Sequence, residues 1–320
     1  MTAPPVVALI GPTASGKSAL ALAVARRLAR AGRACEIVNA DSMLVYRGMD
    51  IGTAKPSAAE RAEVPHHLVD IAEITWTASV AQFQALARAA IADIRARGAV
   101  PLVVGGSALY MHAVLDELAF PPTDPAVRAR WQAELDRVGA PALHAVLAER
   151  SSEAAAGILP GNGRRIVRAL EVIELTGTFT SVLPAPRYAL GGVRQFGLRL
   201  DRAALDARIA ARVEAMWDAG LVEEVAGLER RGLRHGVTAA RALGYRQVLA
   251  FLDGEVTEAA ARQATIDATR RFAHKQETWF KRDPRIRWLD PAAPETVETL
   301  VAAGLGRDGG AHADEAGVVT

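Results

Sequence analysis

Gly11-Pro12-Thr13-Ala14-Ser15-Gly16-Lys17-Ser18 follows the apolar run Val6 to Ile10 and precedes a segment rich in Ala, Leu and Arg with helical spacing. This order of strand, glycine-rich loop and helix is the context in which a G-x-x-x-x-G-K-S sequence binds phosphate. Backbone N–H groups of such a loop and of the helix N-terminus point at the anion. Lys17 adds a positive charge, and the Ser18 hydroxyl is the expected protein ligand of Mg²⁺. The loop therefore predicts a polyphosphate ligand, without saying which one.

Further apolar runs predict more strands of the same sheet, at Glu36 to Ala40, Val100 to Val104 and Gln195 to Leu200. Between them, Ala78 to Arg97 has the apolar spacing of a helix. Strands that alternate with helices favour an α/β fold, here a P-loop NTPase-like parallel sheet flanked by helices. Ligands bind at the carboxyl ends of such strands. Asp41 and Ser107 follow two of these strands, so we expect both beside the phosphate loop.

The middle of the chain has a different character, because residues 118–163 contain helical patterns and Pro- and Gly-rich breaks but no strand. This composition predicts a small all-helical insertion in the core. The core would then comprise residues 1–117 and residues 164–300, the second part ending in helices. Residues 301–320 are dominated by Gly, Ala and Asp, which predicts a disordered tail.

Composition narrows the class of protein. The chain has 320 residues, a formal net charge of +2 and one cysteine, Cys35, which excludes an internal disulfide and a cysteine-clustered zinc site. We find neither a membrane-spanning apolar run nor the layout of a signal peptide, so we expect a cytoplasmic protein without membrane contact. Nearly all basic residues are arginines, which reflects either GC-rich codons or contacts to phosphate.

The phosphate loop alone leaves the type of enzyme open. Nucleotide hydrolases and motors usually carry an acidic residue at the end of the third strand, but here that strand ends Val103-Val104-Gly105-Gly106. Asp41, at the end of the second strand, lies where small-molecule kinases of the phosphate-loop class often bind their substrate. A kinase is therefore one reading, and a non-catalytic RNA-binding protein with a vestigial nucleotide site is another.

The segments beyond the loop resemble one family. Asp41 to Pro56 (DSMLVYRGMDIGTAKP), His66-His67-Leu68-Val69-Asp70, Gly105 to Tyr110, Arg165 to Glu171, Gly244 to Gln247 and Gln276 to Trp279 occur in the order of the tRNA dimethylallyltransferases, also called tRNA isopentenyltransferases. The resemblance spans residues 6 to about 288. It implies transfer of a dimethylallyl group from its diphosphate to N6 of the adenosine just 3′ of the anticodon, in tRNAs that read codons starting with U.

The resemblance also implies partners and cofactors. The phosphate loop would hold dimethylallyl diphosphate rather than ATP, with Mg²⁺ as cofactor, and the anticodon stem-loop of tRNA would be the macromolecular substrate of a monomeric enzyme. ATP as a weak occupant of the loop stays open. A related core transfers the prenyl group to free adenine nucleotides, but the helical insertion and the basic C-terminal half favour tRNA.

The resemblance assigns roles to individual residues. Asp41 is the candidate base that accepts the amine proton, although it could instead bind Mg²⁺ or only orient the base. Lys17, Ser18 and Arg212 are the other catalytic candidates, with Arg208 one helical turn from Arg212. Diphosphate binding falls to Gly11, Pro12, Thr13, Ala14, Ser15, Gly16, Lys17 and Ser18. The helical insertion is expected to contact tRNA. The candidate tRNA contacts are Asp41, Ser42, Met43, Leu44, Ser107, Arg128, Arg164, Arg165, Arg168, Arg241, Gly244, Tyr245, Arg246, Lys275, Gln276 and Lys281.

Overall fold

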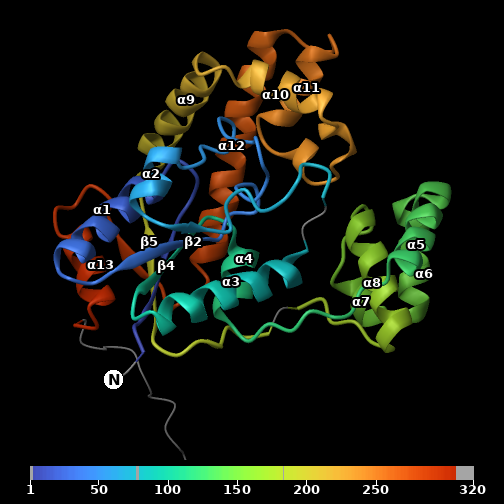
Figure 1. The fold of residues 1–320 in the computed structure, drawn as a ribbon. Coiled ribbons are helices and arrows are strands. Elements are labelled where there is room, and N and C mark those ends of the chain that lie inside the picture. Colours follow the sequence, from blue (N-terminus) through green and yellow to red (C-terminus); the bar gives the residue numbers. More distant parts are fainter. Residues whose placement is uncertain (1–2, 77–78, 183, 308–320) are drawn as a thin grey trace, which may run out of the picture. The chain divides into compact units, whose positions relative to one another are not determined.

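The computed structural model describes residues 3–76, 79–182 and 184–307, and within them the chain forms a six-stranded parallel sheet (Figure 1). The strand order is β3-β2-β4-β1-β5-β6. The strands are β1 (Val6–Ile10), β2 (Cys35–Asn39), β3 (His66–His67), β4 (Val100–Gly105), β5 (Val193–Leu198) and β6 (Arg287–Leu289). The expected fold class is confirmed. Strands β3 and β6 were not predicted, because two or three residues are too few to show a period.

Both faces of the sheet are covered by helices, so its central strand β1 is buried along its whole length. Val7 and Leu9 belong to a core shared with α1 (Lys17–Arg30) and α13 (Thr296–Gly304). Val6, Ala8 and Ile10 alternate with them and belong to the opposite core, which includes α3 (Val80–Ala96) and α4 (Ala108–Leu115). The continuous apolar run of β1 thus reflects burial on two sides.

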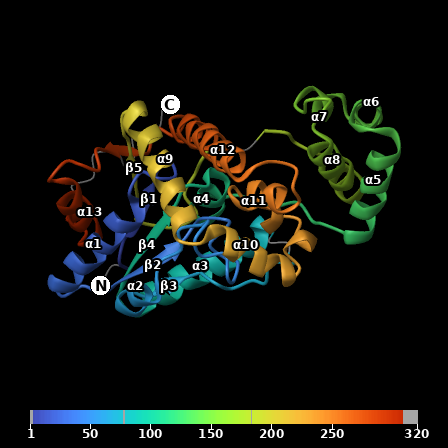
Figure 2. The ribbon, with the colours of Figure 1, turned by 90° about the horizontal axis from the view of Figure 1, so that it is seen from above.

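The C-terminal half of the core is helical, as the sequence indicates. It contains α9 (Arg202–Asp218), α10 (Leu221–Arg230), two 3₁₀ turns η1 (Leu233–His235) and η2 (Ala239–Arg241), α11 (Tyr245–Leu252) and α12 (Glu258–Phe280). Asp201 caps α9 by accepting from two backbone N–H groups, and a stripe of Leu205, Ile209, Val213 and Trp217 is buried. Helices α9 and α12 lie side by side (Figure 2). The short helix α2 (Ala58–Glu63) follows β2 and carries a capping box.

A second compact unit runs from Leu118 to Arg187. It contains α5 (Pro125–Val138), α6 (Ala140–Arg150), α7 (Ser152–Ala156) and α8 (Gly163–Thr176). The sequence placed the end of the insertion at residue 163, but Ile166, Val167 and Leu170 of α8 are buried in the core of this unit. The Pro160 to Gly163 break therefore separates two helices of one unit, and α8 belongs to it because its apolar face packs there.

The expected disorder of residues 301–320 is wrong for its first part. Helix α13 continues to Gly304, and its Val301 and Ala303 are buried against the α1 side of the sheet. Small residues give this segment a loop-like composition, yet they allow close packing on Leu28 of α1. Residues 308–320 lie outside the described residues. Among the described helices, none has the length and apolar character needed to cross a membrane.

Candidate active site

The glycine-rich loop joins β1 to α1 and takes a shape that presents backbone N–H groups. Gly16 is the N-cap of α1 with φ 95°, a left-handed conformation that favours glycine. Ala14 also has positive φ, 62°, which is uncommon for a residue with a Cβ atom. The first turn of α1 has N–H groups without intrahelical acceptors, and these are the donors that bind anions at helix N-termini.

Lys17 folds back over this loop. Its Nζ donates to the Pro12 carbonyl at 2.6 Å and lies 3.5 Å from the Ser15 hydroxyl. Burial lowers the pKa of Lys17 to about 7, the nearby Asp41 carboxylate offsets part of that effect, and Arg212 adds to it. The amine is therefore a poorly compensated buried cation, a state that a bound anion would relieve.

Asp41 is held at the carboxyl end of β2 by Asn39. The buried Asn39 side chain accepts from the Asp41 N–H at 2.7 Å and donates to the carbonyls of Asp41 and Leu68 at 3.0 and 2.9 Å. The Asp41 carboxylate accepts from the Met43 N–H at 2.9 Å through Oδ1. The sequence analysis missed Asn39, although its place two residues before Asp41 allows this clamp.

Two arginines of α9 approach the loop, one helical turn apart. Arg212 is half-buried, and burial lowers the pKa of its guanidinium while the Asp41 charge raises it. Its Nη2 contacts the Thr53 carbonyl at 3.5 Å. Arg208 is exposed and lies over the loop, since a Cβ atom on Gly16 would come within 3.2 Å of its Nη2. The fold thus brings Lys17, Asp41 and Arg212 into one corner from distant parts of the sequence.

The segment that follows Asp41 is pinned from α10 and α11. Glu224 accepts from the N–H groups of Asp50, Ile51 and Gly52 at 3.0, 2.7 and 3.3 Å, and from the Tyr245 hydroxyl at 2.6 Å. Burial and the adjacent Glu224 charge raise the pKa of Tyr245. Tyr245 is fully buried and reaches this segment through Glu224, and Gly244 is buried as well, so burial argues against the RNA contacts expected of both.

Ser107 lies at the end of β4, next to the phosphate loop. It is the N-cap of α4, but its hydroxyl makes no capping hydrogen bond to that helix. The preceding Gly106 carbonyl accepts from Nε2 of Gln276 at 2.7 Å, and Oε1 of Gln276 accepts from the Thr13 N–H at 2.9 Å. Both polar ends of the Gln276 side chain are therefore used inside the core, which argues against the RNA contact expected from the sequence.

Several of the other expected RNA contacts are accessible on the core unit. Arg241, Arg246, Lys275 and Lys281 are exposed, while Ser42, Met43 and Leu44 are partly buried. Trp279 is 40% exposed and meets the His112 ring edge-on, with ring centroids 5.8 Å apart. These residues provide charged and aromatic surface on the part of the molecule that carries Asp41 and the loop.

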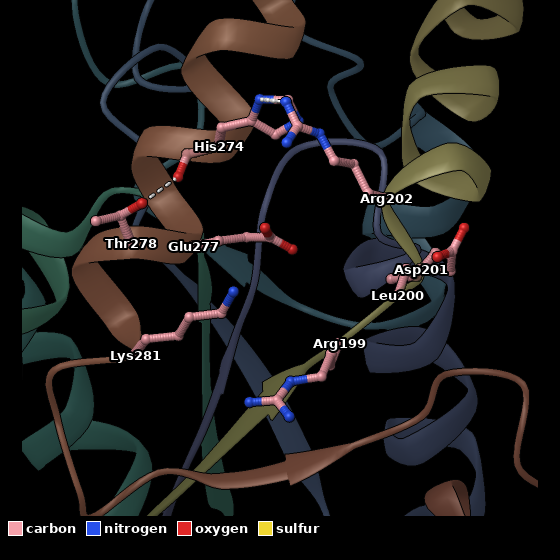
Figure 3. A pocket seen from close by; sticks show the side chains of 8 residues that line it. All are labelled: Arg199, Leu200, Asp201, Arg202, His274, Glu277, Thr278 and Lys281. Atoms are coloured by element: carbon pink, nitrogen blue, oxygen red, sulfur yellow. Dashed lines mark hydrogen bonds between the residues drawn. The ribbon is translucent and has the colours of Figure 1, made fainter.

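A cavity of about 590 Å³ opens between α12 and the segment that follows β5 (Figure 3). Glu277 and Lys281 extend into it from α12, and Arg199 enters from the other side. Arg202 donates to Nδ1 of His274 at 3.4 Å. Arg199 and Arg202 were not singled out in the sequence, because isolated arginines in an arginine-rich chain carry no signal. The lining is mostly polar, with Arg199, Arg202 and Lys281 beside the carboxylates of Asp201 and Glu277.

In the Leu118–Arg187 unit, two of the four expected RNA-binding arginines are used internally. Arg128 and Arg168 both pair with the fully buried Glu171, at 2.7 and 2.9 Å. Arg165 donates to the Ser181 carbonyl at 2.6 Å and is exposed. Arg164 is exposed, and among the described residues it has no hydrogen bond or ion pair. Arg164 and Arg165 thus remain the stronger candidates for RNA contact.

The residues at the loop fit a magnesium ion that is shared with a phosphate ligand. Ser18 is exposed at the start of α1, and Asp41 supplies a carboxylate nearby. Among the described residues, no group of three or more His, Cys, Asp and Glu side chains could hold a metal by itself. Mg²⁺ usually takes one or two protein oxygens and completes its shell with water and phosphate oxygens, so the donor set is adequate.

Comparison with known proteins gives a consistent answer. Residues 44–283 match the family model described as IPP transferase. The chain is 62% identical over 298 residues to the tRNA dimethylallyltransferase of Kineococcus radiotolerans, covering 92% of this chain and 93% of that protein. It is 58% identical over 300 residues to the enzyme of the same name from Thermobifida fusca, covering 93% of each.

Solved structures agree with these sequence matches. The full-length tRNA isopentenylpyrophosphate transferase of Bacillus halodurans has a TM-score of 0.68 and 37% identity, covering 95% of this chain and 96% of that one. A eukaryotic dimethylallyltransferase acting on tRNA has a TM-score of 0.72 and covers 93% of this chain and 76% of that one. At 22% identity, this second likeness concerns the fold alone.

Proposed function

The chain belongs to the IPP transferase family, the tRNA dimethylallyltransferases, and from this premise we propose that it prenylates the adenosine 3′ of the anticodon. The donor is dimethylallyl diphosphate, held in the loop Gly11 to Ser18, and the acceptor atom is N6 of the adenine. The observation that carries the proposal is the corner in which burial lowers the pKa of two cations, Lys17 and Arg212, and the nearby Asp41 carboxylate acts on both.

The acceptor half of the reaction depends on Asp41. The lone pair of an exocyclic adenine amine is delocalised into the ring, so the amine needs a base as the new bond forms. N6 attacks the allylic carbon, the C–N bond forms, and an N6 proton passes to the Asp41 carboxylate. Asn39 and the Met43 N–H hold this carboxylate in place. Because Oδ1 of Asp41 accepts from the Met43 N–H, Oδ2 is the oxygen that receives the proton.

The donor half depends on the loop. The C–O bond breaks as the C–N bond forms, and the diphosphate leaves with the electron pair. Loop N–H groups, Lys17 and Arg212 surround the place where this charge develops, and each such donor is worth about 3–4 kcal/mol by analogy with oxyanion holes. Mg²⁺, held through Ser18 and the diphosphate, would neutralise further charge on the leaving group. A charged ligand also restores the pKa of Lys17 toward its ordinary value.

The adenine must leave the anticodon-loop stack to reach this corner, at a cost of a few kcal/mol in a single-stranded loop. Phosphate contacts and stacking offset that cost. The exposed Arg241, Arg246, Lys275 and Lys281 would make phosphate contacts, and the exposed Trp279 would offer an aromatic surface. The cavity lined by Arg199 and Arg202 is a further place for a backbone phosphate.

The test uses the mass of the RNA. The protein is incubated with Mg²⁺, dimethylallyl diphosphate and an anticodon stem-loop with consecutive adenosines, and the expected product is heavier by one dimethylallyl group. A matched stem-loop with inosine at the target position lacks the N6 amine and should gain nothing. No gain on the adenosine stem-loop, with ATP consumed on a small acceptor instead, would favour the phosphate-loop kinase.

A further inference from the structure

Gln276 has an unusual position for a residue of the basic helix α12, because it is only 6% exposed and lies between two loops of the active site. Its Oε1 accepts from the Thr13 N–H at 2.9 Å, and its Nε2 donates to the Gly106 carbonyl at 2.7 Å. Thr13 belongs to the phosphate loop at the end of β1, and Gly106 follows β4. One amide therefore joins the ends of two strands that are neighbours in the sheet.

The junction leaves no spare space. A Cβ atom at Gly106 would lie 2.5 Å from Nε2 of Gln276 and 3.0 Å from the carbonyl oxygen of Gly11, the first residue of the loop. The amide is thus seated directly on backbone, and the glycine at position 106 is what admits it. A primary amide holds its accepting oxygen and its donating NH₂ group in a single plane, so it fixes the spacing and the orientation of both loops.

The same helix supports the next loop residue. Ala14, which follows Thr13, has the positive φ of 62° and packs in a small cluster with Ala273, one turn before Gln276 on α12. Such a backbone persists only where its surroundings hold it. The Gln276 bond to the Thr13 N–H removes that donor from the ligand set, and the Ser15 N–H donates to the Pro12 carbonyl at 3.3 Å, which leaves the N–H groups of Ala14, Gly16 and Lys17 to meet a phosphate.

The neighbours of Gln276 on α12 differ from it in exposure. Lys275 and Trp279 are exposed, whereas Gln276 is buried. Gln276 is only 6% exposed and both ends of its amide bond to backbone, so it offers RNA far less surface than Lys275 and Trp279 do. Lys275 and Trp279 thus belong to the exposed side of α12, whereas Gln276 holds the loop from its buried side.

We propose that Gln276 is a positioning residue for the diphosphate donor, an inference that rests on the proposed function. Its amide holds the phosphate loop at a fixed distance from the end of β4, where Ser107 lies. It touches neither RNA nor the reacting atoms. Its loss should weaken the Michaelis complex with dimethylallyl diphosphate and slow transfer, because displaced loop donors no longer meet the leaving group, and it should leave RNA affinity unchanged.

Three variants test this. Gln276→Leu removes both hydrogen bonds, Gln276→Glu keeps an acceptor for the Thr13 N–H but cannot donate to Gly106, and Gln263→Leu is the control. Gln263 is exposed on the same helix, and its one side-chain hydrogen bond within the described part of the chain goes to Asp267, at 3.0 Å. The measurements are hydrogen exchange at the Thr13 amide, KM for dimethylallyl diphosphate, kcat, and Kd for the stem-loop, with thermal unfolding as a check of folding.

For Gln276→Leu we expect the Thr13 amide to exchange at least tenfold faster, KM for the diphosphate to rise about tenfold, and the stem-loop Kd to stay within twofold. For Gln276→Glu we expect Thr13 to remain protected while KM still rises. If Gln276→Leu does not fold, Gln276→Glu still tests the Gly106 half of the junction through KM. Gln263→Leu should match the parent protein in all four quantities.

Two outcomes would overturn the proposal. A weaker stem-loop Kd with an unchanged KM for the diphosphate would make Gln276 an RNA contact, and unchanged values throughout would make the junction merely structural. Failure of the proposed function is distinguishable, because then the parent protein would form no prenylated RNA. In that case the exchange rate of the Thr13 amide would still decide whether Gln276 holds the loop.

Discussion

Two regions of the molecule carry charged side chains that are buried in full or in part, and they differ in whether these charges are paired. In the Leu118–Arg187 unit, Arg128 and Arg168 pair with the buried Glu171. Burial alone would raise the pKa of Glu171, but hydrogen bonds from Thr123, Arg168 and Arg128 lower it. At the corner of the phosphate loop, burial instead lowers the pKa of Lys17 and of Arg212. Among the described residues, neither of these two cations has an ion-pair partner.

The difference separates structural charge from functional charge. A buried carboxylate with two guanidinium partners and further donors is satisfied within the fold, and removing a partner leaves an uncompensated charge. A buried cation whose pKa is displaced and whose charge is unpaired indicates a ligand site. The arginine clusters of the sequence could not show this distinction, because pairing is decided by packing.

The largest expected effect concerns Asp41, the carboxylate that raises the pKa of both cations of the corner. Asp41→Asn keeps an oxygen for the Met43 N–H, so the turn should survive, but the base is lost. We expect turnover to fall about 100-fold or more, with stem-loop and diphosphate affinities within a few fold. Single-turnover kinetics measure the chemical step, and Asp50→Asn is the control, at an exposed carboxylate of the same segment that pairs with Lys55 at 2.7 Å. Unchanged turnover would mean that Asp41 is not the base.

The next effect concerns the unpaired amine. Lys17→Met should weaken binding of inorganic diphosphate by about 100-fold, because the charge that meets the anion is lost. The pKa of Lys17 is about 7 in the folded protein and ordinary in the unfolded chain. Below pH 7 the amine is protonated in both states, and its buried charge destabilises the folded protein to the full extent. Between pH 7 and the ordinary pKa the folded protein loses the proton while the unfolded chain keeps it, so this destabilisation shrinks as the pH rises.

Lys17→Met should therefore raise the free energy of unfolding at pH 6 by about 2–4 kcal/mol, and the gain should shrink steadily between pH 7 and pH 10. Calorimetry gives the affinity, and denaturant unfolding across this pH range gives the stability. Lys275→Met, on the exposed face of α12, should show neither change. A Lys17→Met protein less stable than the parent at pH 6 would contradict the assignment of an unpaired charge.

A paired arginine should affect stability instead. Arg128→Ala leaves Glu171 buried with one guanidinium partner fewer, and we expect the Leu118–Arg187 unit to lose about 1–3 kcal/mol. Hydrogen exchange in α5 and α8 would show this loss. The salt dependence of stem-loop binding should be unchanged, and a flatter salt slope with full stability would return Arg128 to the RNA contacts.

The smallest effect is expected at an unpaired arginine of the same unit. Arg164→Ala should leave stability within about 0.5 kcal/mol, since its exposed side chain has no partner among the described residues. If Arg164 contacts an RNA phosphate, the mutation reduces the slope of log Kd against log salt by about one. A titration at several salt concentrations measures this. An unaltered slope would remove Arg164 from the interface.

Sequence alone predicted the elements with strong local signals. The loop Gly11 to Ser18, the strands beside it and the apolar stripe of α9 all have periods or motifs that a single chain displays. The resemblance to the family, and with it the activity, was confirmed by the comparisons. The arrangement of Asp41 at the end of β2 followed from parallel-sheet geometry.

Contacts between distant segments were not predictable. The Asn39 clamp, the Glu224 support of residues 50–52 and the Gln276 junction each depend on where a side chain points after the core has packed. For the same reason the sequence did not show that Tyr245, in the family motif Gly244 to Gln247, is fully buried. The same limit explains the end of the chain, where Ala and Gly in α13 have a weak pattern yet pack closely.

The most direct test of the account is a crystal structure of the protein with dimethylallyl diphosphate. We predict both phosphates within hydrogen-bond distance of the N–H groups that follow Thr13 and of Lys17, with the allylic carbon facing Asp41. Phosphates bound instead in the cavity of Arg199 and Arg202, or an Asp41 carboxylate turned away from the ligand, would contradict it.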